Sequence, residues 1–330
     1  MKKYLSIFFI LIVASVMFGC SNNKKTYAMS DYILNLDYKE DFKILQLTDT
    51  HIGIKDNQQY QYDFIDLTIK DSNADFIVIT GDLFTFADKA LAKRYFEFID
   101  SYGIPWTVVF GNHDEQCYFS VEWLTNLLNN YGSNCYFKDL QDDDVFGNCN
   151  FAINLMDGNK IKEQLIFMDS NRYMYGSYIG YDYIKEDQVK WYENLVKYTQ
   201  SLNDGVVVPS VAFFHIPLPE FDDAWNASQE GSPDAILEEG TKKENCCPPK
   251  ENTGLFDKML ELSSTKAILV GHDHINNFRI LYKGIYLCYG VNSTDRVYYD
   301  EDMMGGHVIT IKTDNSLEFL QIFHHYNEVK

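Results

Sequence analysis

The chain has 330 residues, which allows one large domain or two ordinary ones. Hydrophobic residues make up 46% and aromatic residues 15% of it, so a substantial core can form and a disordered or fibrous chain is excluded. The 48 acidic residues outnumber the 28 lysines and arginines, and the formal net charge is −20. This charge repels phosphate backbones, so broad nucleic-acid binding is not expected, and by itself it also disfavours a small phosphorylated substrate.

The first twenty residues are typical of an export signal. Lys2 and Lys3 precede an apolar run over residues 4–18, which ends at Gly19 and Cys20. The run is about 15 residues long, short for a bilayer span of roughly 20. A cysteine directly after a small residue resembles a bacterial lipoprotein signal, which predicts an exported protein held at the cell membrane by a lipid on Cys20. An ordinary cleaved signal or an uncleaved anchor is the alternative.

Apolar strands alternate with helical stretches over the first 115 residues, an order typical of α/β proteins. The strand segments are near-continuous apolar runs, as expected of a sheet that is buried on both faces. The expected strands are 42–48, 75–80 and 106–110, and the helices between them are 60–73 and 88–101.

The rest of the chain has a looser pattern with more β-structure. Two of its strands are expected to pair around a turn at Asp157-Gly158-Asn159. The expected elements, in chain order, are a helix near 121–131, strands 151–155 and 165–168, a helix over 185–200, strands 211–214 and 267–270, and β segments near 284–289, 307–312 and 318–323.

An acidic stretch from about residue 220 to residue 250 separates two of these strands. It contains glycine, proline and the adjacent pair Cys246 and Cys247. Because it is longer than a usual connection, we expect it to be irregular and either functional or mobile.

No linker is visible after Thr26, which favours a single domain. We assign residues 1–19 to the signal peptide, 20–41 to a polar tether and lead-in, and 42–325 to the domain. Six cysteines remain beyond Cys20, an even number that permits disulfides in an exported protein. Their pairing is open, and the six are Cys117, Cys135, Cys149, Cys246, Cys247 and Cys288.

Five of the expected strands end in polar clusters. Open α/β sheets place their sites at the carboxyl ends of strands, so we expect these clusters to meet. Glycine precedes three of the clusters and allows the backbone to approach closely. The clusters are Asp49-Thr50-His51, Gly81-Asp82, Gly111-Asn112-His113-Asp114, His215 and Gly271-His272-Asp273-His274.

The side chains in these clusters are of the types that bind metals. Imidazole and carboxylate groups suit Fe, Mn, Zn or similar divalent and transition ions better than copper(I) or an iron–sulfur cluster. Seven ligands are too many for one tetrahedral ion, and they suit two ions if one carboxylate bridges them. The candidate ligands are Asp49, His51, Asp82, Asn112, His215, His272 and His274.

The order of the clusters, D-x-H, G-D, G-N-H-D, H and G-H-x-H, resembles the calcineurin-like metallophosphoesterase superfamily. The resemblance covers about residues 42–325. The blocks FKILQLTDTH, GNHDE, FFHIPLPE and GHDH are most similar to the branch near the purple acid phosphatases, in fungal and plant phosphatases. The resemblance implies the metallophosphoesterase fold, an α/β four-layer α-β-β-α sandwich of two mixed β-sheets flanked by helices.

The resemblance also assigns roles to residues. It implies that Asp49, His51 and His274 hold one metal, that Asn112, His215 and His272 hold the other, and that Asp82 bridges both. His113 would face the substrate, stabilising negative charge or protonating the leaving oxygen. Asp114 would orient His113.

One position departs from the pattern of true purple acid phosphatases. Those enzymes have a ligating tyrosine in G-D-x-x-Y and a glycine where this chain has His51. Here the stretch runs from Gly81 to Thr85, and Thr85 replaces the tyrosine. A purple iron–tyrosinate centre is therefore not expected, and His51 takes the vacant ligand position.

The arginines are few, and two of them are candidates for a functional role. Arg94 lies in an expected helix and is interpreted as part of a solvated face. Arg172 and Arg296 are candidates to contact a phosphate.

The function implied by the resemblance is dinuclear metal-dependent hydrolysis of phosphate esters by a metal-activated hydroxide. We expect a small phosphorylated substrate, most readily a phosphomonoester, since the similar branch consists of phosphatases. A phosphodiesterase or nucleotide-processing hydrolase on the same site is one alternative. A catalytically silent scaffold with the same fold is an alternative from another class. The exact substrate, the metals and the oligomeric state are left open.

Overall fold

The structure is a computed structural model that describes residues 27–55, 58–174, 180–325 and 328. The expected signal over residues 1–19 lies outside the described residues. Among the described residues, no helix has both the length and the apolar composition to cross a bilayer.

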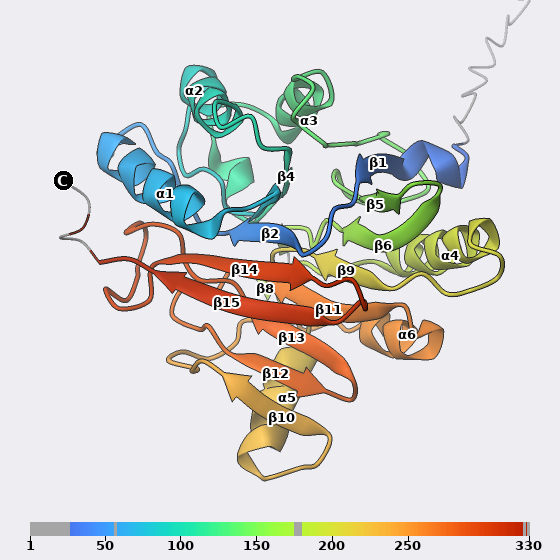
Figure 1. Ribbon diagram of the computed structural model, residues 1–330. Helices are drawn as coiled ribbons and strands as arrows, with labels where there is room; N and C mark the ends of the chain where they lie inside the picture. The colour runs from blue at the N-terminus through green and yellow to red at the C-terminus, as the bar shows by residue number, and fades with distance from the viewer. Residues whose placement is uncertain (1–26, 56–57, 175–179, 326–327, 329–330) are drawn as a thin grey trace, which may run out of the picture.

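Two mixed β-sheets form the centre of the molecule (Figure 1). The smaller sheet has the strand order β15-β14-β2-β3-β4, in which β2, β3 and β4 run parallel and β14 and β15 are antiparallel to their neighbours. Its strands are β2 (Phe42–Leu47), β3 (Phe76–Thr80), β4 (Trp106–Val109), β14 (Gly305–Ile311) and β15 (Leu317–Phe323).

The larger sheet has eight strands in the order β1-β5-β6-β9-β11-β13-β12-β10. Its central strands β6, β9, β11 and β13 are parallel. The strands are β1 (Ile33–Asp37), β5 (Phe151–Asp157), β6 (Lys160–Phe167), β9 (Ser210–Phe213), β10 (Ala235–Glu239), β11 (Thr265–Val270), β12 (Arg279–Tyr282) and β13 (Ile285–Tyr289). A separate short hairpin joins β7 (Tyr173–Met174) to β8 (Gly180–Tyr181).

Helices cover the outer faces of the two sheets (Figure 1). Three of them, α1 (Gln58–Ser72), α2 (Lys89–Asp100) and α3 (Val121–Asn129), belong to the core of the smaller sheet. The other three, α4 (Glu186–Leu202), α5 (Glu220–Gln229) and α6 (Leu255–Leu262), pack on the larger sheet. The expected four-layer α-β-β-α sandwich is therefore confirmed.

The alternation of side chains along the larger sheet explains its two-sided burial. Val211 and Phe213 of β9 point into the core between the sheets, while Ala212 points into the core beneath the helices. The rings of Phe167 and Phe213 stack with centroids 5.3 Å apart in the inner core. Because successive residues of a strand face opposite sides, a sheet covered on both faces needs the continuous apolar runs that the sequence contains.

The acidic stretch 220–250 is not irregular throughout, so that expectation was wrong. It contains α5 and β10. Phe221 of α5 packs edge-on against Tyr289, with ring centroids 5.2 Å apart. Four of the five residues of β10 are exposed, and this strand forms by antiparallel pairing with β12. Pairing at a sheet edge leaves little apolar periodicity in the sequence, which explains why the element was missed.

The amino-terminal lead-in contributes to the larger sheet. Within residues 20–41, β1 pairs in parallel with β5 along its whole length. Tyr32, just before β1, is buried and meets Trp191 of α4 with ring centroids 5.7 Å apart.

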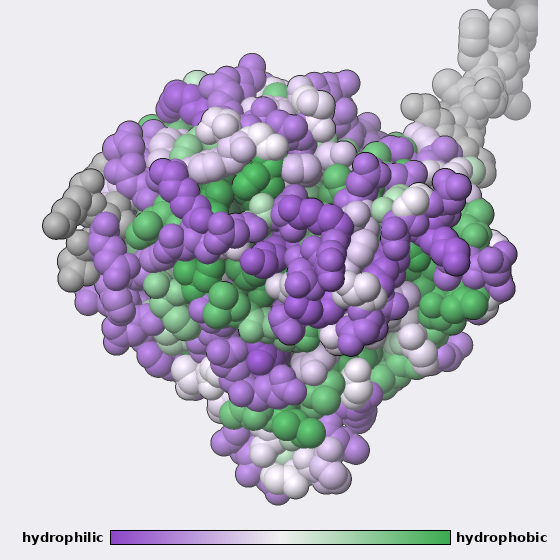
Figure 2. Space-filling view, viewed as in Figure 1, coloured by the Kyte–Doolittle hydropathy of each residue, from purple (hydrophilic) through white to green (hydrophobic). Residues whose placement is uncertain are grey.

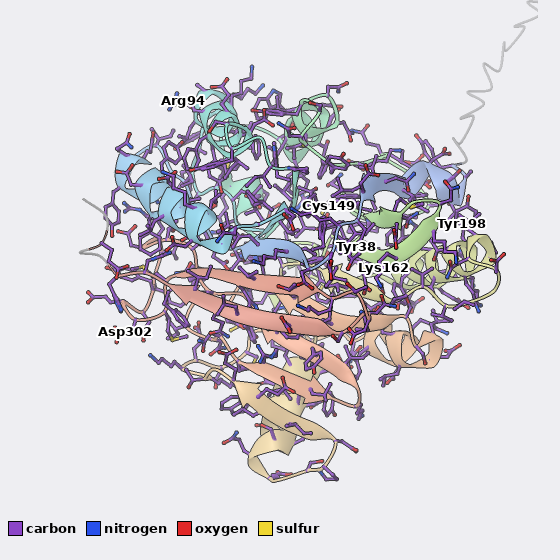
Figure 3. The ribbon with its side chains drawn as sticks, viewed as in Figure 1. Tyr38, Arg94, Cys149, Lys162, Tyr198 and Asp302 are labelled. Atoms are coloured by element: carbon purple, nitrogen blue, oxygen red, sulfur yellow. The ribbon has the colours of Figure 1, made fainter. Side chains whose placement is uncertain are left out.

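The surface is largely polar, as the charge of the chain requires. Figure 2 shows hydrophilic residues over most of the visible face, with smaller apolar areas between them. Arg94 is exposed on α2, as predicted (Figure 3).

The six cysteines beyond Cys20 are free thiols. Burial raises the pKa of all six, so they stay protonated near neutral pH and are poor nucleophiles.

Candidate metal centre

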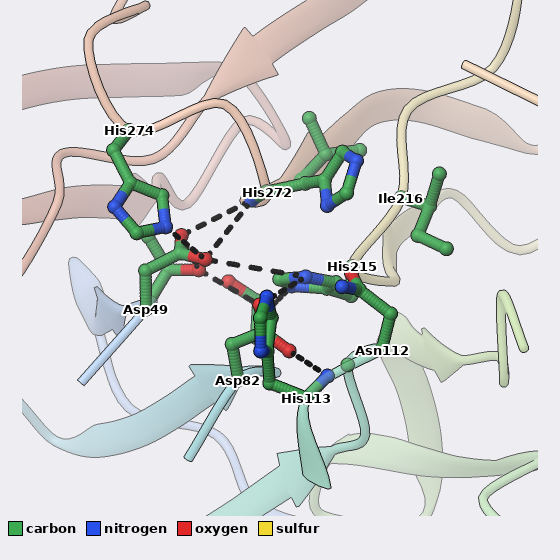
Figure 4. A network of polar contacts seen from close by, with 12 residues as sticks. Asp49, Asp82, Asn112, His113, His215, Ile216, His272 and His274 are labelled. Atoms are coloured by element: carbon green, nitrogen blue, oxygen red, sulfur yellow. Dashed lines mark hydrogen bonds and ion pairs between the residues drawn. The ribbon is translucent and has the colours of Figure 1, made fainter. Parts of the chain in front are cut away.

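The five polar clusters meet at the carboxyl ends of β2, β3, β4, β9 and β11 (Figure 4). Four candidate ligands have backbone torsions in the left-handed region: Asp49, His51, Asp82 and His272 have φ of 55°, 44°, 49° and 79°. Such conformations cost about 1–3 kcal/mol each and persist where surrounding structure enforces them, a pattern typical of functional sites.

Two groups of side chains each bring potential metal-binding atoms within 4.8 Å of one another. One group is Asp49, His51, Asp82 and His274, and the other is Asp82, His215 and His272. Asp82 belongs to both. A carboxylate has two oxygens that can bind separate ions, so this arrangement suits two metals that share one ligand.

Backbone carbonyl groups set the orientation of two of the imidazole rings. Nδ1–H of His215 donates to the carbonyl oxygen of Thr80 at 2.8 Å, and Nδ1–H of His274 donates to that of Tyr298 at 2.7 Å. A proton on Nδ1 leaves the Nε2 lone pair of a neutral ring free to bind a metal, the usual arrangement around protein-bound metals.

His51 is held in a related way. Its Nδ1 lies 2.7 Å from Oγ1 of Thr85, the residue that replaces the purple acid phosphatase tyrosine. Its Nε2 lies 3.2 Å from Nε2 of His274 and 3.5 Å from Oδ2 of Asp82. With the ring protons on Nδ1, two Nε2 lone pairs face each other, and a cation between them removes the repulsion.

Three buried polar atoms in and beside the second group have no hydrogen-bond partner among the described residues. They are Oδ1 of Asn112, Nε2 of His215 and Nε2 of His272. Nε2 of His215 lies 3.2 Å from Oδ2 of Asp82 but outside hydrogen-bonding geometry. Buried polar groups are rarely left unpaired, since each costs about 1–3 kcal/mol. These three atoms come from the three residues predicted to hold the second metal, so the donor set fits two metal ions.

The metal-free centre balances its charge with protons. Burial alone would raise the pKa of Asp49, but His274 and His215 outweigh it and lower the pKa to about 2. Burial alone would lower the pKa of His215, but Asp82 and Asp49 raise it to about 10. Burial lowers the pKa of His51 and of His272 to about 3. Metal ions therefore compete with protons for this centre.

Close packing explains the glycines that precede three clusters. A Cβ on Gly111 would lie 2.3 Å from the backbone nitrogen and from Oδ1 of Asp82. A Cβ on Gly271 would lie 2.0 Å from Oγ1 of Thr48, and one on Gly81 would lie 2.6 Å from the ring of His215. Glycine thus lets the strand ends approach the ligands, as predicted.

His113 lies beside the clusters and belongs to neither. Its half-buried ring meets the ring of His51 edge-on, with centroids 5.0 Å apart. Its backbone N–H donates to Oδ1 of Asp82 at 2.7 Å.

The role predicted for Asp114 was wrong. Its buried carboxyl group, whose pKa burial and the nearby Asp82 raise to about 8, accepts the backbone N–H groups of Gly111 at 2.8 Å and Phe84 at 3.0 Å, and it therefore braces the loops. Gln116 contacts His113 instead, with Oε1 2.8 Å from Nδ1. Asp114 lies one residue away along the chain, but its side chain points toward backbone donors that only the fold brings near.

Three tyrosines near the centre were missed in the sequence. Tyr173 accepts a hydrogen bond from Nδ2 of Asn112 at 2.6 Å. The ring of Tyr181 meets the ring of His272 edge-on, with centroids 4.3 Å apart. The ring of Tyr298 stacks on that of His274, with centroids 4.2 Å apart. The chain has 24 tyrosines, and nothing local distinguishes these three.

The two candidate phosphate contacts, Arg172 and Arg296, have different surroundings. Arg172 donates to Oδ1 of Asn148 at 2.7 Å and lies 3.7 Å from a carboxylate oxygen of Glu115. Arg296 pairs with Asp295 at 3.3 Å and lines a cavity beside His51.

Comparison with known proteins agrees with this geometry. The profile of the calcineurin-like phosphoesterases matches residues 42–276. The chain belongs to this family.

Two relatives illustrate how similar the sequence of this chain is to known proteins. The probable inactive purple acid phosphatase 14 of Arabidopsis thaliana is 31% identical over 286 residues, covering 75% of this chain and 69% of the relative. The phosphatase DCR2 of Saccharomyces cerevisiae is 27% identical over 280 residues, covering 76% of this chain and 47% of the relative.

A solved structure shows the same fold. The dimetal phosphatase from Danio rerio superposes with a TM-score of 0.53 at 13% identity, covering 86% of this chain and 99% of that chain. Membership of the calcineurin-like phosphoesterase family and the two ligand groups together indicate a dinuclear metal-binding site at the edge of the sheets.

Substituting Gly111 tests the close packing of the centre. We expect Gly111→Ala to lower metal occupancy, because the new methyl group displaces Asp82, and to destabilise the fold by about 1–3 kcal/mol. Gly132→Ala is the matched control, since Gly132 also lacks a positive φ and a Cβ there would have no neighbour within 4 Å. Metal analysis and thermal unfolding of both variants measure the effect. Equal behaviour of the two variants would contradict the packing argument.

The charge balance predicts that metal uptake releases protons. His215, whose pKa Asp82 and Asp49 raise to about 10, holds a proton on Nε2 in the metal-free protein, and a metal there must displace it; the pKa of His274 is raised as well. Affinity for Zn²⁺ is therefore expected to rise from about pH 6 to about pH 8, about tenfold per pH unit for each proton displaced. Calorimetry in two buffers of different ionisation enthalpy counts the protons. Uptake without proton release would show that both rings are already neutral.

Proposed function

We propose that this phosphoesterase hydrolyses phosphate esters, most readily phosphomonoesters, at the two-metal centre. The observation that carries the proposal is the position of Asp82, whose carboxylate belongs to both ligand groups. When bound, two metal ions supply an activated water and neutralise charge on the phosphoryl group. Asp49, His51, Asp82 and His274 would hold one ion, and Asn112, His215, His272 and the shared Asp82 would hold the other.

The protein itself supplies position and proton control. Nδ1–H of His113 donates to Oε1 of Gln116 and holds the ring, so that Nε2, when it also carries a proton, can donate to a phosphoryl oxygen or protonate the leaving oxygen. The hydrogen bond from the backbone N–H of His113 to Asp82 ties this ring to the shared ligand. Asp114 braces the same loop through Gly111 and Phe84. Pre-positioning of this kind needs no covalent intermediate.

A catalytically silent protein is the second candidate. It is favoured by the word "inactive" in the name of the Arabidopsis thaliana relative, whereas the yeast relative is named a phosphatase. Against it, this chain retains the whole predicted ligand set and His113. A silent protein has no need of buried ligand atoms without partners, such as Oδ1 of Asn112 and Nε2 of His272, each of which costs stability unless a metal binds.

Two substitutions separate metal binding from turnover. Asp82→Asn is expected to reduce both metal content and phosphatase activity, because it weakens the only ligand that the two groups share. His113→Ala is expected to retain the metals and to lower kcat by about 10²–10⁴, the usual contribution of a general acid or base. Metal analysis and steady-state assays with an aryl phosphate and an aryl phosphodiester measure both effects.

The outcomes discriminate between the candidates. Equal metal loss in both variants would contradict the assigned roles. Faster hydrolysis of the diester would overturn the phosphomonoesterase proposal in favour of a diesterase. Absence of hydrolysis of either ester by the metal-loaded protein would favour the silent protein.

A further inference from the structure

A cavity of about 570 Å³ opens directly beside the metal centre. His51 and Thr85, which are joined by a hydrogen bond of 2.7 Å, form part of its lining. Because His51 is one of the candidate ligands, a phosphate ester bound at the centre can extend its alcohol portion into this space.

The walls of the cavity are formed by apolar side chains that are open to solvent. Ile54, Phe86, Tyr118 and Val297 line it, and their exposed fractions are 44%, 56%, 68% and 58%. We call this set the aryl pocket. Single exposed apolar residues are common, but a gathering of four in one hollow marks a binding surface.

Two of these wall residues have strained backbone torsions. Phe86 has a φ of 52°, and Val297 has a φ of 64°. A β-branched residue in the left-handed region is a true outlier, and its cost of about 1–3 kcal/mol must be offset by surrounding contacts.

Contacts with the metal centre supply that support. Tyr298, next to Val297, accepts the Nδ1–H of His274 through its carbonyl oxygen, and Thr85, next to Phe86, contacts Nδ1 of His51. The strained residues thus present their apolar side chains to the cavity from positions tied to ligands. The backbone N–H of Tyr118 donates to the carbonyl oxygen of Ala87 at 2.8 Å and joins the third wall to the second.

The charge of the lining suits an anionic substrate. Lys55 and Arg296 line the cavity, and none of its described lining residues is acidic. Arg296 is paired with Asp295 at 3.3 Å, so the positive charge that the lining offers to an anion is that of Lys55. Hydrogen-bonding side chains such as Thr85 and Tyr118 stand among the apolar walls, so the lining suits an aromatic ring, including one that carries polar groups.

We propose that the aryl pocket binds the leaving group and selects phosphomonoesters whose alcohol portion carries an aromatic ring. The inference rests on the proposed hydrolysis and names its substrate class. Phe86 and Tyr118 supply ring faces for stacking, Ile54 and Val297 supply apolar contact, and Lys55 attracts the anion.

The test compares benzyl phosphate with ethyl phosphate on the metal-loaded protein, because their leaving groups have similar basicity. We expect kcat/KM to be at least about tenfold higher for benzyl phosphate, the discrimination that apolar pockets provide. Phe86→Ala should lower kcat/KM for benzyl phosphate about tenfold more than for ethyl phosphate. Leu320→Ala, which removes a 59% exposed side chain from β15, is the control and should leave the preference unchanged. Equal values for the two esters in the wild-type protein, or an equal loss for both in Phe86→Ala, would overturn the proposal.

A binding measurement separates this inference from the proposed hydrolysis. Benzylphosphonate and ethylphosphonate are not hydrolysed, and calorimetry on the metal-loaded protein gives their affinities. One outcome is that neither ester is hydrolysed, but benzylphosphonate binds at least about tenfold more tightly than ethylphosphonate and Phe86→Ala removes that difference. That result would support the aryl pocket and contradict the proposed hydrolysis. Equal binding of the two phosphonates would overturn the pocket.

Discussion

The shared position of Asp82 is the interaction on which the rest of the centre depends. Its carboxylate lies 3.5 Å from Nε2 of His51 and 3.2 Å from Nε2 of His215, one ring from each ligand group. All of these side chains are almost completely buried. Burying such groups without a compensating charge is costly, so the centre is stable only with cations, which are protons in the metal-free protein and metals in the loaded one.

The fold brings the ligands of this centre together at the ends of its strands. Parallel strands from two facing sheets end at one edge, and each delivers ligands there. Glycines at Gly81, Gly111 and Gly271 let the strand ends approach within contact distance of the ligands. The apolar layers on both sides of each sheet hold these ends still, and the left-handed torsions at the ligands persist because that packing enforces them.

A net charge of −20 by itself disfavours a phosphorylated substrate, but the acidic residues are not spread evenly over the chain. Only Asp49 and Asp82 bring carboxylates to the ligand groups, and bound cations outweigh them. The neighbouring aryl pocket adds the positive charge of Lys55 with no acidic residue among its described lining. Most of the surplus acidic residues therefore lie away from the ligand groups, and the proposed phosphorylated substrate would meet a less acidic site than the net charge suggests.

The sequence by itself determined the α/β class, the strands that carry the site and the residue types of the metal ligands, because apolar periodicity and strand-end motifs are local features. Only the tertiary structure decided which side chain holds His113: Gln116 reaches the ring, whereas Asp114 turns to the N–H groups of Gly111 and Phe84. The same is true of β10, which exists through pairing with β12, and of the aryl pocket, whose walls come from segments far apart in the chain. These features depend on contacts between distant segments, and no local pattern encodes which donor or surface a side chain meets.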